Sequence, residues 1–284
     1  FRRAHALAVT AGDRALRATA AGWLATGSFN ASDVPAMAAH LHDALSHAAP
    51  DNHSAQARLG LVLADAFRFA DDDEQAQRWY LHARQHASAE GDSSMISVLL
   101  YNISAVRSGR IGLDDAFGRA DLDLAAKALI EADSTANYDQ GTGMTALTTM
   151  GQVIRAQLMV VLARYADAIA LFDAHLVRAR SQGTGHREAR FLADRAWCHF
   201  NLEKVSNALR DARAAEAALP SQFDADDRAA THARLARIYL ECGQASDAAI
   251  HQAKAEDALA EHQASQQLML KALQQTLAQR GAAG

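Results

Sequence analysis

The histidines are the first residues in this chain that could carry out chemistry, and there are thirteen of them. His82 and His86 are four residues apart, which would place both imidazoles on one face of a helix, a spacing that can ligate zinc. No Glu accompanies this pair as in the H-E-x-x-H motif of zinc enzymes, and no third ligand is evident. Four further histidines lie close together in sequence: His40, His42, His47 and His53. Because so many histidines produce such spacings by chance, we expect no metal site.

Two glycine-containing motifs and two cysteines also fail to predict catalysis. The motifs begin at Gly141 and Gly183, both read G-T-G, and lack the preceding strand and the lysine of phosphate-binding loops. We interpret them as turns between helices. Cys198 and Cys242 lie in no recognisable nucleophile motif, so we interpret them as small buried side chains in a reduced compartment. We therefore expect no enzyme activity and no cofactor.

Three groups of neighbouring carboxylates have two interpretations. The acidic run Asp71–Glu74 could form a metal-binding loop. Carboxylates at a helix start also accept hydrogen bonds from free backbone N–H groups and complement the helix dipole. The pairs Asp114–Asp115 and Asp226–Asp227 lie near expected helix starts as well. We favour capping for all three groups.

The elements that would position these residues follow a repeat. Small residues recur on the expected first helix of successive units, at Ala64, Ser104, Ala156, Ala196 and Ala236. Successive members of this series are separated by 40, 52, 40 and 40 residues. A period of this size, made of two helices, is typical of stacked repeat proteins. The longer interval predicts an insertion near residues 132–145, where we expect an irregular stretch, after a turn at Gly109–Gly112.

Composition limits the fold and the partners. Three prolines in 284 residues and abundant alanine, the best helix former, predict an all-α protein. A net charge of −5 and scattered arginines argue against nucleic-acid binding. No apolar run is long enough to span a membrane, so we expect a cytoplasmic location. The amino end has neither a starting Met nor a signal-peptide core, so we expect a segment of a longer protein.

The repeat pattern resembles the tetratricopeptide repeat (TPR) family, which pairs a small residue and an aromatic on its first helix with Ala-like positions on its second. The match is clearest where Ala236, Tyr239, Gly243 and Ala248 fall as the family's pattern requires. It covers roughly residues 50–258. The period is longer than the family's usual value of about 34 residues. This longer form is similar to the regulatory repeat domains of bacterial signalling proteins, in which a helix-turn-helix activator or a diguanylate cyclase often follows.

The resemblance implies a right-handed superhelix of stacked antiparallel hairpins, an α-solenoid, with the first helices lining its concave side. We expect about six hairpins in a repeat domain over residues 1–258, and an extended capping or connecting helix over 259–284. The candidate groove residues are Arg58, Asp65, Arg68, Tyr101, Asn102, Gln157, Arg190, Asp194, Trp197, Arg234 and Arg237. Asn102 could bond the backbone of an extended peptide or be a surface residue without a partner. Trp197 could be a platform for a ligand or a core filler.

Two functions fit these expectations. The first is a non-catalytic module that binds a protein or peptide segment and regulates an adjoining effector. Its last helix, with Leu270, Leu273 and Leu277 on one side, could form a homodimer or cap the last repeat. The second is a sensor that holds a small molecule inside the superhelix near residues 132–145. A buried polar cluster around Asn102 and Arg155 would favour the sensor, whereas a long open groove would favour the peptide.

Overall fold

A computed structural model describes residues 1–219 and 224–282, which form helices and turns without any strand. The all-α expectation is therefore confirmed. In that part of the chain, no helix combines the length and the apolar character needed to cross a membrane. Pro220, which the repeat pattern places at the end of a unit, and the last two residues lie outside the described residues.

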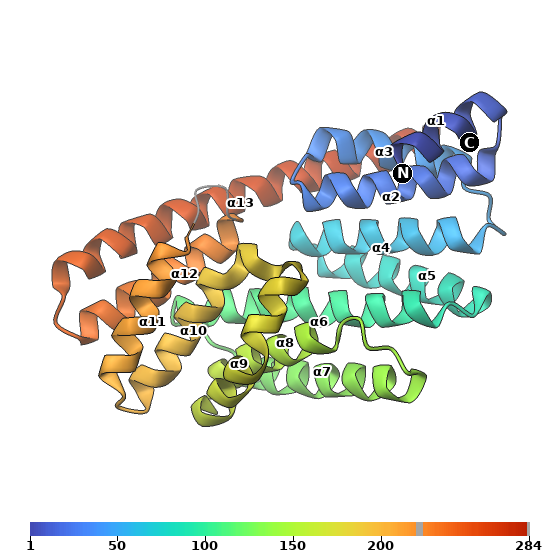
Figure 1. The fold of residues 1–284 in the computed structure, drawn as a ribbon. Coiled ribbons are helices and arrows are strands. Elements are labelled where there is room, and N and C mark those ends of the chain that lie inside the picture. The colour runs from blue at the N-terminus through green and yellow to red at the C-terminus, as the bar shows by residue number, and fades with distance from the viewer. Residues whose placement is uncertain (220–223, 283–284) are drawn as a thin grey trace. The chain divides into compact units, whose positions relative to one another are not determined.

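The described helices form two compact units (Figure 1). Unit 1 contains residues 1–102 and the chain from residue 264 onward, and unit 2 contains residues 103–263. Two helices, α6 (Ser93–Ala116) and α13 (Ala245–Ala282), each begin in one unit and end in the other. We describe each unit by itself.

Unit 1 is built from two helical hairpins preceded by a short helix. Its complete helices are α1 (Arg2–Ala11), α2 (Arg14–Asn30), α3 (Val34–His47), α4 (His53–Phe69) and α5 (Asp73–Glu90). Helix α2 packs on α3 and α4 packs on α5, while α2 and α4 also contact each other. The expected caps form: the Asp72 carboxylate accepts a hydrogen bond from the Gln75 backbone N–H at the start of α5. The acidic run that begins at Asp71 is therefore the start of a helix.

Unit 2 contains the most regular hairpins. Its complete elements are α7 (Leu122–Thr142), α8 (Thr148–Val161), α9 (Tyr165–Ala179), the turns η1 (Arg180–Thr184) and η2 (Gly185–Arg187), α10 (Glu188–Asn201), α11 (Val205–Ala217) and α12 (Ala225–Glu241). The pairs α8–α9 and α10–α11 are antiparallel hairpins, and the first helices α8, α10 and α12 pack in succession. This succession is what a stack of hairpins requires.

The predicted repeat register is visible in the packing. The five small residues of the series lie on α4, α6, α8, α10 and α12, and all are buried: Ala64, Ser104, Ala156, Ala196 and Ala236. The turns repeat as well, because residues with positive φ follow the first helices at Ala163, Glu203 and Gly243, each 40 residues from the next. Small side chains at these positions let neighbouring helices approach closely.

Three expectations about element limits are wrong. Gly109–Gly112 is not a turn, because α6 continues through it to Ala116. The stretch expected to be irregular after residue 132 is helical as far as Thr142, so long helices take up the additional residues of the 52-residue interval. The last helix starts at Ala245 rather than at residue 259. In each case packing sustains a helix through residues that are weak helix formers or that the repeat pattern placed outside it.

The apolar side of α13 is covered by the chain's own fold. Met269 and Leu273 are buried, and Leu270 and Leu277 are partly buried. Within unit 1 the Gln266 side chain donates a hydrogen bond to the Phe69 carbonyl, with Nε2···O at 2.9 Å. Part of the leucine stripe of the last helix thus packs inside the chain, and a homodimer through this helix stays a prediction.

Candidate functional site

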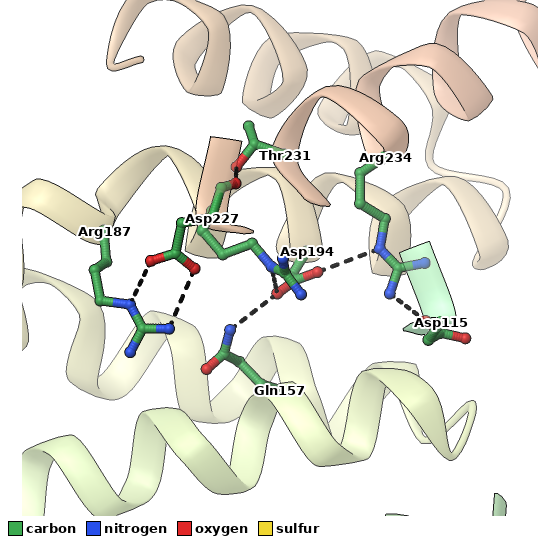
Figure 2. A network of polar contacts seen from close by, with 8 residues as sticks. Asp115, Gln157, Arg187, Asp194, Asp227, Thr231 and Arg234 are labelled. Atoms are coloured by element: carbon green, nitrogen blue, oxygen red, sulfur yellow. Dashed lines mark hydrogen bonds and ion pairs between the residues drawn. The ribbon is translucent and has the colours of Figure 1, made fainter. Parts of the chain in front are cut away.

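Six of the eleven candidate groove residues meet in unit 2, on the inward faces of α8, α10 and α12. Among them, Gln157, Asp194 and Arg234 are labelled in Figure 2. We call five residues of this region the inner network: Asp115, Gln157, Arg190, Asp194 and Arg234. Each of the five has a buried or nearly buried side chain that forms a hydrogen bond or an ion pair with another member. Asp115, which lies on α6, is the one member that was not among the candidate groove residues, because its sequence position indicated a helix cap.

Asp194 is the centre of the inner network. Its Oδ2 accepts from Gln157 Nε2 at 3.2 Å and from Arg190 Nε at 3.1 Å. Its Oδ1 accepts from Arg234 Nε at 3.3 Å. The carboxylate is therefore shared by α8, α10 and α12, three successive first helices, and it ties them together through charge-assisted hydrogen bonds.

The last turn of α6 is held by two arginines of α12. Arg234 Nη2 donates to the Asp115 carboxylate, and Arg237 Nη1 donates to the Asp115 backbone carbonyl at 3.0 Å. The final carbonyls of a helix lack intrahelical donors and carry the negative end of its dipole, so cations bind there favourably. Asp115 thus offers α12 both its carboxylate and its backbone carbonyl, which also accepts from the Gly118 N–H at 2.9 Å.

Apolar packing supports the same contact. Leu113 and Ala116 of α6 belong to a buried cluster with alanines of α12 and α13: Ala229, Ala230, Ala233, Ala255 and Ala258. The C-terminal end of α6 consequently lies against the inward face that was expected to be an open groove. This part of the expected groove is filled by the chain itself.

Glycine permits the approach of α6 to α10. A Cβ atom at Gly112 would lie 2.6 Å from Arg190 Nη2, which is closer than real contacts of this kind. Gly112 is therefore a packing residue in a helix, and not part of the turn that its sequence neighbourhood indicated. Sequence spacing offers no signal for this contact, because its partner follows far along the chain.

Arginines outnumber carboxylates in this region. Two carboxylates, Asp194 and Asp115, are faced by three arginines: Arg190, Arg234 and Arg237. Two of the guanidinium nitrogens, Arg190 Nη2 and Arg234 Nη1, are buried without a hydrogen-bond partner. Burial opposes the charge of Arg234, but Asp194 and Asp115 outweigh that effect and raise the pKa of its guanidinium. Burial lowers the pKa of Arg237, and the neighbouring Arg234 lowers it further.

Trp197 lies beneath these cations. The Arg237 guanidinium is centred 4.2 Å from the indole centroid and that of Arg234 5.5 Å, within the range of cation–π attraction. The ring is 9% exposed, so it contributes to the core while it also contacts the network. This burial agrees with the interpretation of Trp197 as a core filler, and its role as a platform for a ligand stays a prediction.

The carboxylate pairs expected to cap helices have different roles. Asp115 lies at the end of α6 and not at a helix start, so the capping interpretation is wrong for Asp114–Asp115. Asp227 lies in the first turn of α12, where Arg187 Nε and Nη2 donate to its two oxygens at 2.7 and 3.2 Å (Figure 2). Burial raises the pKa of Asp227, but the attraction of Arg187 outweighs it, and the pKa is lowered.

Unit 1 contains a second, smaller polar cluster. The buried Asp65 carboxylate accepts from Tyr80 Oη at 2.5 Å and from Asn102 Nδ2 at 2.7 Å. Burial raises the pKa of Asp65 to about 6, although both hydrogen bonds and the charges of Arg58 and Arg68 oppose the shift. Asn102 is therefore paired with a side chain of the chain itself, where a peptide-binding asparagine would need a free amide.

The other candidates in unit 1 are also turned inward. The Arg58 guanidinium is stacked 3.5 Å from the ring centroid of Trp23, and burial lowers its pKa to about 10. Arg68 pairs with Asp73 at 2.7 Å, and Tyr101 is half-buried. In unit 2, Arg155 pairs with Asp133, with Nε and Oδ1 2.6 Å apart.

His82 and His86 lie on one face of α5, as their spacing predicted. Their ring centroids are 4.5 Å apart, and His86 Nδ1 is 2.8 Å from His53 Nδ1 at the start of α4. His82 Nε2 is instead 3.1 Å from the Gln56 side-chain oxygen. Among the described residues, no three His, Cys, Asp or Glu side chains are placed so that they could hold one metal ion.

The arrangement in unit 2 is therefore suited to holding a helix end by charge, hydrogen bonds and close packing. No family model matches the chain, and no curated protein is significantly similar to it. The function must accordingly be argued from the geometry of the inner network.

Proposed function

We propose that this chain is a non-catalytic helical-repeat module that binds a helical protein segment on the inward face of α8, α10 and α12 and thereby regulates an adjoining effector. The observation that carries the proposal is the seating of α6 on this face. Its last turn offers the Asp115 carboxylate to Arg234 and the Asp115 backbone carbonyl to Arg237, which shares that carbonyl with the Gly118 N–H. A face that recognises the chain's own helix end in this way has the chemistry to recognise a partner's.

The repeat pattern supports the same proposal. Successive first helices with buried small residues occur in modules of the tetratricopeptide type, which act by binding protein segments. According to this proposal, α6 occupies the inward face of α8, α10 and α12 when no partner is bound. A tethered helix has a high effective concentration, so a partner must supply more favourable contacts or meet a weakened α6.

A competition experiment tests the proposal. The probe is a fluorescent synthetic peptide of residues 103–118, which contains the end of α6. In the full chain, Asp115→Asn removes the charge that holds α6 to Arg234 while keeping nearly the same shape. We expect the peptide to bind this variant at least about tenfold more tightly than the wild-type chain, a difference of about 1.4 kcal/mol. Fluorescence anisotropy of the labelled peptide measures the binding.

Two controls make the result specific. Asp114→Asn changes the neighbouring carboxylate, which pairs with Arg119 and not with α12, and should leave the peptide affinity as in the wild type. A peptide that itself carries Asp115→Asn should lose its affinity for the Asp115→Asn chain. Equal binding of both peptides, or no binding by either variant, would refute the proposal.

A further inference from the structure

Two buried histidines join α12 to the first part of α13 in unit 2. His232 Nδ1 and His251 Nδ1 are 2.8 Å apart, and the ring centroids are 5.0 Å apart. The side chains are 7% and 2% exposed, so water contributes little to their hydrogen bonding. The other nitrogen of His251, Nε2, is 3.4 Å from Glu216 Oε1, which comes from α11. Tyr239 donates to the second oxygen of Glu216 at 3.2 Å.

The number of protons that this cluster can hold follows from its geometry. One hydrogen lies between the two Nδ1 atoms, because a donor must face an acceptor. With both rings neutral, His232 donates to His251, and His251 Nε2–H faces Glu216. One added proton is accommodated if His251 becomes the imidazolium beside the Glu216 carboxylate and His232 becomes the acceptor. A second added proton places hydrogens on both facing Nδ1 atoms and two positive charges in contact, which breaks the bond.

The remaining charged groups around the pair make the second proton still less favourable. On α12 the nearest is Arg228, and on α13 they are Lys254 and Asp247. Burial, the neighbouring His251 and the two cations lower the pKa of His232 to about 4. Burial also lowers the pKa of His251, while Glu216 and Asp247 act in the opposite direction. Low pH therefore favours a state in which α12 and α13 have separated and water solvates both imidazole rings.

We propose that His232 and His251 form a two-proton latch that holds the α12–α13 hairpin closed and opens it when both imidazoles are protonated. Its position gives the latch a consequence for the inner network. His232 is two residues from Arg234 on α12, so opening the hairpin loosens the helix that holds Asp115. Acid would in this way expose the inward face of unit 2.

Unit 1 provides a comparison for the latch. His53 Nδ1 and His86 Nδ1 are also 2.8 Å apart, but both rings are partly exposed. Burial and His53 lower the pKa of His86. Solvent can stabilise a second proton there, so protonation of this pair should open its hairpin much less.

Hydrogen exchange of the whole chain between pH 7 and pH 4 tests the latch, with rates corrected for the intrinsic effect of pH. Protection of the α12 and early α13 amides should fall on the order of 100-fold toward pH 4, as expected when a group titrates near 4 in the closed state and near 6.5 in the open state. His232→Gln keeps a hydrogen-bonding side chain but takes up no proton, and should abolish most of this pH dependence. The matched variant His86→Gln should leave it unchanged.

Imidazole NMR of the wild-type chain keeps the test decisive if His232→Gln does not fold. The first protonation of the pair should leave α12 protected, and the second should coincide with the loss of protection. The proposal is overturned if α12 stays protected through pH 4, if its opening accompanies the first proton, or if His232→Gln opens in acid as the wild type does. None of these results bears on peptide binding at neutral pH, so the latch and the proposed function fail separately.

Discussion

Gly112 of α6 lies against Arg190 of α10 so closely that a methyl group at residue 112 would be 2.6 Å from the guanidinium Nη2. The contact joins helices that are far apart in sequence. It also explains why a helix interior contains a residue with poor helix propensity. The inward face of unit 2 is shaped by this approach as well as by the charges around Asp194.

Replacement of Gly112 by Ala should therefore destabilise unit 2. The better helix propensity of Ala favours the variant by about 1 kcal/mol. Against this, the Arg190 guanidinium must move, which disturbs its bond to Asp194. Overpacking usually costs about 1–3 kcal/mol, so after the gain in helix propensity we expect a net loss of up to about 2 kcal/mol. Urea unfolding followed by far-UV circular dichroism measures it.

Gly109 on the same helix is the matched control, since a Cβ there meets no atom within 4 Å. Gly109→Ala should stabilise the protein by about 0.5–1 kcal/mol through helix propensity alone. If both variants were stabilised equally, the close approach at Gly112 would carry no energetic weight.

The Asp194 carboxylate should be among the most sensitive positions in the chain. Asp194→Asn keeps the shape but leaves Arg190 and Arg234 without the charge that both contact. Breaking a buried charge pair in this way costs about 3–5 kcal/mol. The control is Asp173→Asn, which removes a 59% exposed partner of Arg195 and should cost less than about 1 kcal/mol. Chemical denaturation at neutral pH compares the two, and similar losses would contradict the central role of Asp194.

Asp65 should make unit 1 less stable as the pH rises from about 4 to 6. Its pKa is raised to about 6 in the folded protein, from an ordinary value of 3.8. The folded state therefore holds the proton more tightly, and this contribution is complete below pH 3.8 and is lost as the pH passes through 6. The maximum loss is roughly 3 kcal/mol, at about 1.4 kcal/mol for each unit of pKa.

The variant Asp65→Asn isolates this effect, because it cannot titrate. We expect the difference in unfolding free energy between wild type and variant to shift in favour of the variant between pH 4 and pH 6.5. A difference that does not change with pH would show that Asp65 titrates normally. The contributions of all other acidic groups to the pH dependence cancel in this difference, because wild type and variant both contain them.

At two equivalent turns with positive φ, Gly should give a more stable protein than Ala. Ala163 has φ of 55° and Gly243 has φ of 75°, in the left-handed region that side chains with a Cβ disfavour. Ala163→Gly should relieve this strain and raise stability by about 0.5 kcal/mol, whereas Gly243→Ala should lower it by about 1 kcal/mol. Thermal unfolding of the two variants checks the signs, and a loss of stability in Ala163→Gly would refute the strain.

The sequence predicted features that depend on residues close to one another along the chain. The recurrence of small residues at Ala156, Ala196 and Ala236 predicted buried positions on successive first helices, because a helix places residues of fixed spacing on one face. Asp72 was identified as a cap because the donors it satisfies lie within the next turn. These features need no knowledge of distant parts of the chain.

The sequence by itself determined the helical class and the register of the buried small residues, since propensity and periodicity decide these within one hairpin. Only the tertiary structure decided what meets the inward face. Arg234 and Asp115 are 119 residues apart, so no spacing could show that the end of α6 fills the expected groove. The same long-range packing made Gly112 part of a helix and Asp115 the partner of two arginines, because the free energy of burying that helix end outweighs the local preference of glycine for a turn.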